Sequence, residues 1–470
     1  MKSRMLTHVT AVVLFAALAN PVSLAAQGNR DQQKHHHYKV VDTGTLGGPN
    51  SFLGFEQSRN INDRGVLAAS TDTSTLNSPP FCFNDYCYVQ HTTQWRNGVL
   101  TDLGTLPGSS SGTTWISNAG SIAGLSQLPV IDPLTGSPEL EAVLWSKGEI
   151  VDLGTLGGNE SAAESVNDRN QVVGFALNSV PDQFSGFGTQ MRGFLWQSGA
   201  MQDLGTLGGP DANAFIVNER AQVTGWSSTN STPNTRCYFR LTTDPFLWQD
   251  GKMMDLGTLG GTCGFPNWLN NRGEVVGQSN LAGDSTFHPF LWKRGKMSDL
   301  GALGGNFGTA YSISEAEEIV GWSTTSGDSV RHAFLWKRGR MSDLGVLTVK
   351  RCSVAYAINA KGQIVGGGDD NCGGFNPSAL LWEHGSVIDL NAFVPPDSGV
   401  QLTVALSINE GGTIASLGVV PYGDQHAFVL IPCDGNHPGV EGCDYSLVDA
   451  TLATQSLGSL RVLRSSRPLR

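Results

Sequence analysis

The sequence predicts an all-β protein built as a β-propeller of four-stranded blades, and eight blades is the favoured count. Three observations support this prediction: one phrase recurs along the chain, each copy holds four short strand-like runs, and no segment keeps a helical period. Seven blades, with one degenerate terminal unit, and a linear β-solenoid are the alternatives. The phrase is Asp-Leu-Gly or a close variant, and its copies begin 44 to 60 residues apart at Asp42, Asp102, Asp152, Asp203, Asp255, Asp299, Asp343 and Asp389.

Each copy, or unit, contains four runs of the length of short β-strands. The first runs into Asp-Leu-Gly (Lys296–Leu300), the second ends in Ile-Asn (Ile358–Asn359), the third is β-branched (Val275–Gly277) and the fourth is aromatic (Phe290–Trp292). Short apolar runs bounded by Gly, Asn and Ser are typical of β-strands. Units of this size match the blades of propellers, in which neighbouring sheets protect one another's faces.

The turns of the unit fall into two kinds. Asn62–Gly65 and Lys293–Gly295 show the tight turns that follow the second and fourth runs, with Asn opening the turn and Gly accepting a positive φ. The connections after the first and third runs vary in length, and those after the third run are long in units one to four. Because direction alternates in a meander, the tight turns share one face of the protein and the variable connections share the other.

The ends of the chain divide it into four regions. Residues 1–25 form a predicted secretory signal peptide, with Lys2 and Arg4 before the apolar run Val9–Leu18, which is too short to span a membrane. Residues 26–37 are predicted to be a disordered linker, residues 38–432 the propeller, and residues 433–470 a disulfide clasp with a flexible tail. We therefore expect an exported monomer, periplasmic or extracellular, in which the strand at Tyr38–Val41 closes the ring beside Phe428–Ile431.

All eight cysteines lie after the signal peptide, so an oxidising compartment favours disulfides. Eight cysteines allow 105 connectivities. Six of them fall in variable connections and therefore on one face of the predicted propeller. This placement favours pairing between sequence neighbours: Cys82–Cys87, Cys237–Cys263 and Cys352–Cys372, with Cys433–Cys443 as the C-terminal clasp.

The complete repeating phrase, H-A-F-L-W…G…M-x-D-L-G-T-L-G-G…I-N…G-x-V-V-G, resembles the bacterial extracellular HAF-type repeat. His332–Trp336 and His426–Phe428 carry its namesake letters, and the resemblance covers residues 38 to 432. It implies an exported repeat protein with a propeller fold, and it brings no assigned activity. The first unit departs from the pattern, since Asp42-Thr43-Gly44 replaces Asp-Leu-Gly.

The repeated polar and aromatic residues have structural explanations. The recurring Asp is expected to cap a turn by accepting backbone N–H groups, and one Trp per unit is expected to fill the interface between blades. The histidines that open the fourth run are interpreted as surface residues, because Glu141, Arg192, Asp244 and Ser378 occupy the same position elsewhere. We expect no cofactor and no metal site, and we interpret His35–His37 as part of the linker.

Candidate functional residues lie in the long connections, because binding residues concentrate on loops held by a rigid scaffold. The formal charge of −11 argues against a nucleic-acid partner. Aromatic side chains with a neighbouring Arg mark contact sites, and the candidates are Tyr86, Tyr88, Phe184, Phe187, Tyr238 and Arg240.

The favoured function is a non-enzymatic propeller that binds a glycan, an envelope component or a protein partner through its long-loop face. One alternative is an extracellular hydrolase or lyase with a cleft on the same face, for which Glu160, Asp182 and Asp244 would supply the acids. A structural spacer is the third hypothesis.

The predicted interface role of the repeated Trp can be tested at Trp292. Replacing Trp292 by Ala should lower the free energy of unfolding by about 3–5 kcal/mol, because a large buried side chain is lost, and should leave binding unchanged. Thermal or denaturant unfolding measures the first effect. A variant as stable as the parent would refute the core assignment.

Overall fold

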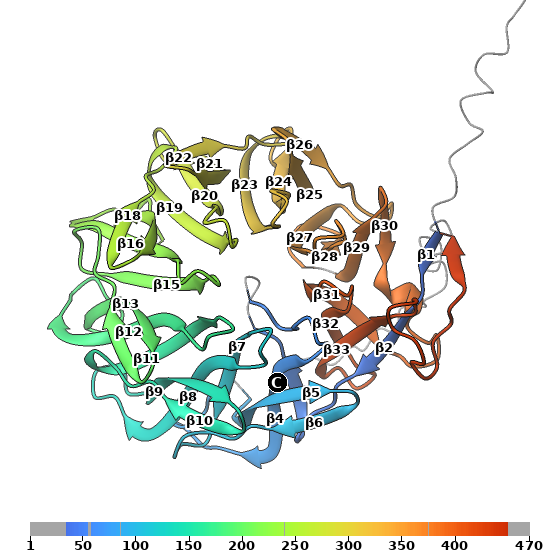
Figure 1. Ribbon diagram of the computed structural model, residues 1–470, viewed down its shortest axis with the longest axis horizontal. Helices are drawn as coiled ribbons and strands as arrows, with labels where there is room; N and C mark the ends of the chain where they lie inside the picture. The colour runs from blue at the N-terminus through green and yellow to red at the C-terminus, as the bar shows by residue number, and fades with distance from the viewer. Residues whose placement is uncertain (1–33, 55–57, 85, 239, 375, 450–470) are drawn as a thin grey trace, which may run out of the picture.

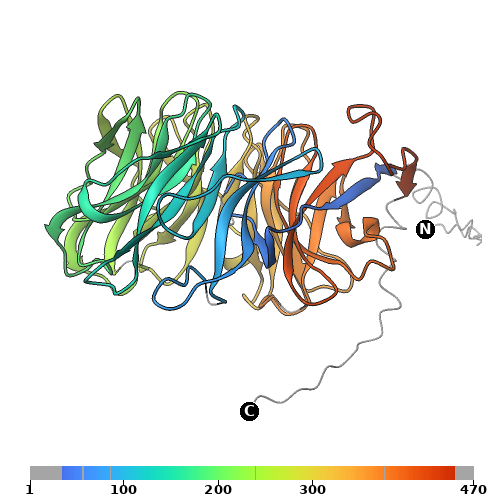
Figure 2. The same cartoon turned by 90° about the horizontal axis from the view of Figure 1, so that it is seen from below.

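The computed structural model describes residues 34–449, apart from residues 55–57, 85, 239 and 375. The predicted signal peptide and the first part of the predicted linker lie outside the described residues, as does the tail from residue 450. The all-β prediction is confirmed: antiparallel sheets follow one another around a ring, seen along its axis in Figure 1 and edge-on in Figure 2. Within the described residues the one helical element is a short 3-10 helix, η1 (Leu390–Phe393).

Four blades are separate sheets, each an antiparallel meander of four consecutive strands. They are β3 (Gly47–Phe52), β4 (Leu67–Leu76), β5 (Tyr88–Arg96) and β6 (Val99–Asp102); β7 (Ser111–Ile116), β8 (Ile122–Ile131), β9 (Pro138–Ser146) and β10 (Glu149–Asp152); β11 (Gly157–Val166), β12 (Val172–Pro181), β13 (Thr189–Gln197) and β14 (Ala200–Asp203); and β27 (Cys352–Ile358), β28 (Ile364–Asp369), β29 (Ser378–Glu383) and β30 (Ser386–Asp389).

A 12-stranded sheet contains three more four-stranded meanders, which single parallel pairings join at Thr243↔Cys263 and Phe287↔Phe307. Its strands are β15 (Ala212–Val217), β16 (Val223–Pro233), β17 (Leu241–Gln249) and β18 (Lys252–Asp255); β19 (Gly260–Leu269), β20 (Val275–Leu281), β21 (Phe287–Lys293) and β22 (Lys296–Asp299); and β23 (Gly304–Ile313), β24 (Ile319–Thr325), β25 (Arg331–Lys337) and β26 (Arg340–Asp343).

The last blade joins the two ends of the chain. It combines β31 (Gln401–Ile408), β32 (Ile414–Val419) and β33 (Gln425–Pro432) with the N-terminal β2 (Tyr38–Asp42), in the order β2-β33-β32-β31. Strands β2 and β33 pair antiparallel from Tyr38↔Pro432 to Asp42↔Phe428, and Figure 1 shows blue β2 beside red β33. The expected closure of the ring by the N-terminal strand is confirmed.

A small two-stranded sheet lies outside the blades, where the two ends of the described chain meet. Its strands are β1 (Lys34–His36) and β34 (Leu447–Asp449), which pair antiparallel with His35 opposite Val448. The prediction that residues 26–37 form a disordered linker is therefore wrong for residues 34–36. The strand was not foreseeable locally, because Lys-His-His has no apolar pattern and its partner lies about 400 residues later.

The repeated Trp packs between blades, as predicted. Trp145 clusters with Val66 and Ala68 of the preceding blade, and Trp248 clusters with Val173 and Leu195 of the blade before its own. A second aromatic layer, which the sequence interpretation did not single out, is completely buried two residues earlier in the strand. It consists of Phe194, Phe246, Phe290, Phe334 and Phe428.

The asparagine that ends the first strand of most blades joins each blade to the next. Its side-chain oxygen accepts backbone N–H groups of its own turn, as Asn62 Oδ1 does from Arg64 and Val66. Its Nδ2 donates to the carbonyl of the equivalent residue in the following blade. These bonds measure 2.9–3.3 Å and run from Asn62 to Ser117, Asn167 to Asn218, Asn218 to Asn270, Asn270 to Ser314, Asn359 to Asn409 and Asn409 to Asn62.

The Asp of the repeated phrase caps a turn, as predicted, and has a second role. Asp102 Oδ1 accepts the N–H of Gly104 at 2.8 Å, and the same carboxylate lies 2.8 Å from Nδ1 of His91 on the neighbouring strand. His288, His332 and His426 make the same pairing with the Asp of the adjacent strand. The interpretation of these histidines as plain surface residues is wrong: their side chains are 16–22% exposed and bonded across the outer strand pair.

The bonds between blades can be tested at the ring closure. Replacing Asn409 by Asp keeps the acceptor for Thr413 N–H but removes the donor to the carbonyl of Asn62 and sets two acceptors against each other. The free energy of unfolding should fall by about 1–3 kcal/mol. Asn97→Asp, at an exposed turn, is the matched control and should melt with the parent. Equal loss in both variants would contradict a special role for Asn409.

Candidate functional site

Four consecutive blades carry hairpins that extend beyond the others on the variable face. Their second and third strands (β4–β5, β8–β9, β12–β13 and β16–β17) are 9 to 11 residues long. The same strands in the other blades have 6 to 8 residues. The long connections inferred from the sequence for units one to four are thus partly strand, and we call these four pairs the extended hairpins.

The extended hairpins expose apolar side chains that the blades have no room to bury. Burial stops before the end of each second strand: in β4, six buried residues are followed by a half-buried residue and three exposed ones. Six of the 12 exposed large hydrophobic residues in the described chain belong to these hairpins. This set, which we call the apolar rim, is 47–86% exposed and consists of Leu76, Tyr86, Val130, Leu134, Val180 and Tyr238.

The candidates chosen from the sequence divide into two groups. Tyr86 and Tyr238 are 67% and 86% exposed and belong to the apolar rim, and Arg240 is exposed beside Tyr238. Tyr88, Phe184 and Phe187 are only partly exposed. The ring of Phe187 lies 6.0 Å from that of Phe175 on β12, so Phe187 packs its loop against the blade.

Sequence reasoning missed the aliphatic members of the apolar rim, because it looked only for aromatics. Leu76, Val130 and Val180 occupy the last residues of second strands, and Leu134 follows in a loop. The signal in the sequence that could have identified them is an apolar residue near the end of a second strand, where the neighbouring residues are already polar.

Each extended hairpin is fastened to the next blade by the residue that directly follows its second strand. Asn77 Nδ2 donates to Ser109 Oγ at 2.7 Å, and Asn234 Nδ2 donates to Thr262 Oγ1 at 2.7 Å. Asp132 Oδ2 accepts from Asn159 Nδ2 at 3.3 Å. In three of the four hairpins the same side chain also accepts N–H groups of its own loop, as Asp132 Oδ1 does from Leu134. The loops are thereby tied to the ring.

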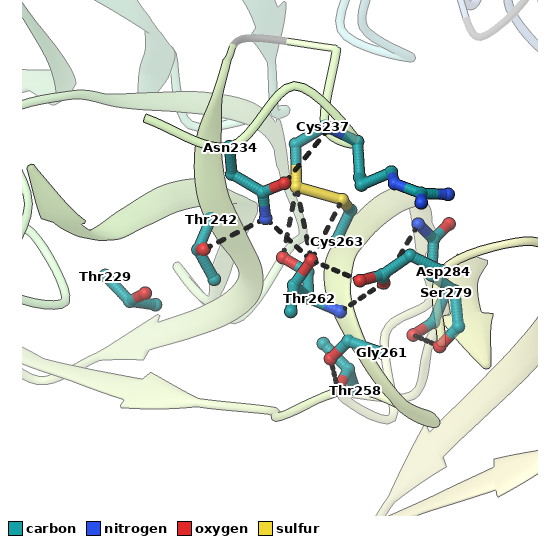
Figure 3. The surroundings of a disulfide bond; sticks show 12 residues. Thr229, Asn234, Cys237, Thr242, Thr258, Gly261, Thr262, Cys263, Ser279 and Asp284 are labelled. Carbon is teal, nitrogen blue, oxygen red and sulfur yellow. Dashed lines mark hydrogen bonds between the residues drawn. A yellow bond between two sulfur atoms is a disulfide. The ribbon is translucent and has the colours of Figure 1, made fainter. Parts of the chain in front are cut away.

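A disulfide strengthens one of these attachments (Figure 3). Cys237 in the β16–β17 loop bonds to Cys263 on β19 of the next blade, and both residues are about 95% buried. Beside it, Thr262 N–H and Oγ1 donate to Asp284 at 2.6 and 2.9 Å. Tyr238 thus sits directly after a cysteine that is covalently tied to the neighbouring blade.

All four predicted disulfides are present: Cys82–Cys87, Cys237–Cys263, Cys352–Cys372 and Cys433–Cys443. Cys263 and Cys352 lie on strands β19 and β27, which corrects their placement in variable loops. The first strand of a blade begins earlier than its apolar run suggests, because its first residues pair through the backbone.

Neighbouring extended hairpins also touch through their loops. A Cβ atom placed on Gly188, in the β12–β13 loop, would lie 3.1 Å from Cδ1 of Leu134 in the β8–β9 loop. Gly188 has a φ of +76°, so it supplies both the turn and the space for this contact. The loops of these two extended hairpins therefore lie against each other.

The acids named for the enzymatic alternative have partners within the fold. Burial raises the pKa of Asp244 to about 7, and the negative charge of Asp255 and a hydrogen bond with it act in the same direction. Burial and the nearby Asp182 raise the pKa of Asp211 to about 7, against the hydrogen bond from Met191 N–H. Asp211 and Asp244 thus each lie near a second carboxylate, from a neighbouring blade or strand.

Glu160 is also buried near other carboxylates, but two acids surround it where Asp244 has one. Burial, followed by the charges of Asp132 and Glu139, raises its pKa to about 7. Asp132 belongs to the attachment of the β8–β9 hairpin, so this acidic group is part of the hairpin base.

An axial pocket of about 310 Å³ opens among the tight turns, on the face opposite the extended hairpins. Its floor includes Trp115 and Trp268, whose rings meet 5.3 Å apart although they belong to β7 and β19. The carboxylates of its rim bond neighbouring turns: Glu315 Oε1 accepts Asn271 N–H at 2.7 Å, and Glu410 Oε2 accepts Ala360 N–H at 2.9 Å. These two carboxylates therefore link neighbouring turns of the ring.

No protein-family model matches the chain, and the search of curated proteins found no relative. Among solved structures, the acylaminoacyl peptidase of Pyrococcus horikoshii is similar over 78% of this chain and 57% of its own, at 10% identity and a TM-score of 0.41. Dipeptidyl peptidase 4 of Porphyromonas gingivalis is similar over 82% of this chain and 59% of its own, at 9% identity and a TM-score of 0.45. TolB of Acinetobacter baumannii is similar over 66% of this chain and 79% of its own, at 10% identity and a TM-score of 0.32.

The chain spans somewhat more than half the length of the two peptidases. At these distances the argument for function rests on the chain's own residues. Among the described residues, no helix has the length and apolar character needed to cross a membrane.

The raised pKa of Asp244 makes stability depend on pH. Because the folded pKa of Asp244 is raised to about 7 from an ordinary value near 4, the folded state binds more protons between these values. Its contribution to the free energy of unfolding therefore falls as pH rises from about 4 to 7. Asp244→Asn should melt above the parent at pH 8 and should vary less between pH 5 and 8.

The control for this measurement is Asp250→Asn, at an exposed turn of the same blade. It should keep the pH dependence of the parent. If Asp244→Asn also keeps it, the pKa of Asp244 is not raised in the folded protein.

Proposed function

We propose that the protein is an exported, non-enzymatic β-propeller that holds a protein partner of the cell envelope on its extended hairpins. The apolar rim is the observation that carries this proposal. Exposed apolar patches on soluble proteins mark interaction sites, and half of the exposed large hydrophobic residues in the described part of the chain lie on four neighbouring hairpins. Export is supported by the predicted signal peptide and by four disulfides.

The rigidity of the extended hairpins supports binding without large rearrangement. Their attachment residues, the Cys237–Cys263 disulfide and the contact between Leu134 and Gly188 fix the loops before a partner arrives. A preorganised surface loses less conformational entropy on association. The HAF-type repeat would, on this proposal, be the name of the scaffold and not of the activity.

A protein partner fits the apolar rim better than a glycan does. Leu76, Val130, Leu134 and Val180 present aliphatic groups, which bury favourably against a protein surface. Sugar hydroxyls need directional polar partners, and aliphatic groups offer none. Tyr86 and Tyr238 add amphipathic rings of the kind enriched at protein interfaces.

The enzymatic alternative receives less support from the geometry. Asp182 lies near Asp211, Asp244 lies beside Asp255, and Glu160 stands with Asp132 in the base of a hairpin. Acid–base chemistry needs two carboxylates at a set separation around one substrate bond. These acids have separate structural partners instead.

The proposal is tested by chemical cross-linking to envelope extract, followed by affinity measurement with the isolated partner. The triple variant Leu76→Ser, Val180→Ser, Tyr238→Ser changes side chains that are 47–86% exposed, so the fold should persist. We expect affinity to fall at least tenfold, since hot-spot side chains each contribute about 1–2 kcal/mol or more.

The matched control is Val99→Ser with Met254→Ser, two exposed apolar residues on the outer strands β6 and β18. This double variant should bind like the parent. Equal loss in both variants, unchanged binding in the triple variant, or recognition of a glycan alone would each refute a protein site on the apolar rim.

A further inference from the structure

The N-terminal strand β1 brings a buried histidine against a turn of the β27–β30 blade. His35 is 1% exposed, and its Nδ1 lies 2.7 Å from Oε1 of Glu383. The rings of His35 and His384 are 5.9 Å apart. One ligand atom from each of His35, Glu383 and His384 lies within 4.8 Å of the others, so three metal-binding groups converge at this point.

One nitrogen of His35 lacks the partner that burial normally demands. Nε2 is buried and has no hydrogen-bond partner among the described residues. Buried polar atoms are almost always bonded, and leaving one unsatisfied costs about 1–3 kcal/mol. A histidine whose Nδ1–H is held by a carboxylate presents the lone pair of Nε2, which is the arrangement found around metal-binding histidines.

The turn that holds Glu383 and His384 departs from the repeat in the two residues concerned. The position of His384 has a φ of +49° to +56° in the equivalent turns, where Asn97, Lys147, Ser198, Asp250, Arg294 and Arg338 stand instead. The turn thus needs no histidine. In two other blades the residue at the position of Glu383 is a Gln that accepts a bond from a neighbouring Gln side chain, as Gln197 does from Gln171.

Glu383 retains this repeated contact and has an oxygen to spare. Gln363 Nε2 donates to its Oε2 at 2.9 Å, which leaves Oε1 for His35. The Glu-His pair is therefore not required by the construction of the blade, and it stands at the turn against which His35 of β1 lies.

We propose that His35, Glu383 and His384 form a site for a divalent transition metal of the zinc class, independent of the partner-binding face. The imidazoles of His35 and His384 bind the ion, and Glu383 holds Nδ1–H of His35. The distance of 2.7 Å between Glu383 Oε1 and His35 Nδ1 is that of a hydrogen bond. Two ligand atoms of one tetrahedral zinc ion would lie about 3.3 Å apart, because zinc–ligand bonds measure about 2.0–2.1 Å.

Such an ion would secure the closure of the ring. His35 lies three residues before Tyr38, where β2 begins and completes the last blade. Glu383 and His384 belong to the blade before it. Metal binding would therefore tie the chain just outside the closing strand to its neighbour, and an ion that binds only the folded protein raises its stability.

The test uses the untagged protein that begins at residue 26, stripped with a chelator and titrated with Zn²⁺ by calorimetry, with Co²⁺ absorption as a second readout. The parent should bind one ion and melt at a higher temperature with zinc. His384→Ala should lose at least tenfold in affinity, and Glu383→Gln should lose 10–100-fold, the usual effect of removing an orienting carboxylate. Neither variant should gain thermal stability from zinc as the parent does.

The most direct variant, His35→Ala, removes a buried side chain and can fail to fold, so the test relies on the variants above and on two controls. His332→Ala removes a histidine paired with Asp343 elsewhere on the ring and should bind zinc like the parent. The double variant His36→Ala, His37→Ala should also bind like the parent. Binding that survives His384→Ala, binding that disappears in the double variant, or no binding by the parent would each overturn the site.

Discussion

The structure depends on contacts between neighbouring blades around the axis, and at six junctions these include a hydrogen bond from a turn asparagine. The amide of the turn asparagine donates to the carbonyl of the next turn, and the last of these bonds runs from Asn409 back to Asn62. A four-stranded sheet is marginal alone, so each blade needs neighbours on both faces. The pairing of β2 with β33 and the bond from Asn409 to Asn62 close the ring at two different radii.

This constraint explains why so much of the sequence repeats and why so little of the repeat points to function. Asn and the interface Trp occupy the same position in successive blades because each contacts the same part of a neighbouring blade, and the capping Asp recurs because each blade has the same turn. The residues that bear on the two proposals are the departures: the apolar rim on four blades, and Glu383 with His384 in one turn.

The sequence predicted the features whose partners repeat at a regular interval. The meander, the two faces, the closing strand and the four disulfides all follow from counting units. Contacts that depend on one unit alone were not visible. His35 and Glu383 are 348 residues apart and no pattern links them, and the raised pKa of Asp211 depends on burial that a sequence does not show.

The candidate site was predicted in part for the same reason. The long connections of units one to four were correctly located, and Tyr86 and Tyr238 are exposed there. Tyr88, Phe184 and Phe187 could not be separated from them, because an aromatic residue in a loop can face solvent or pack beneath it. Leu76, Val130 and Val180 resemble ordinary strand residues until the height of the blade is known.

The most direct test of the central claim, that function lies in the extended hairpins and not in the repeat, is partner binding by a chain in which all four are shortened. Each would be reduced to the connection that joins β20 to β21, in which Leu281 N–H bonds Thr286 O at 2.9 Å. The account predicts a ring that folds with unchanged β-sheet content and no longer binds the envelope partner. Retained binding by the folded, shortened chain would contradict it.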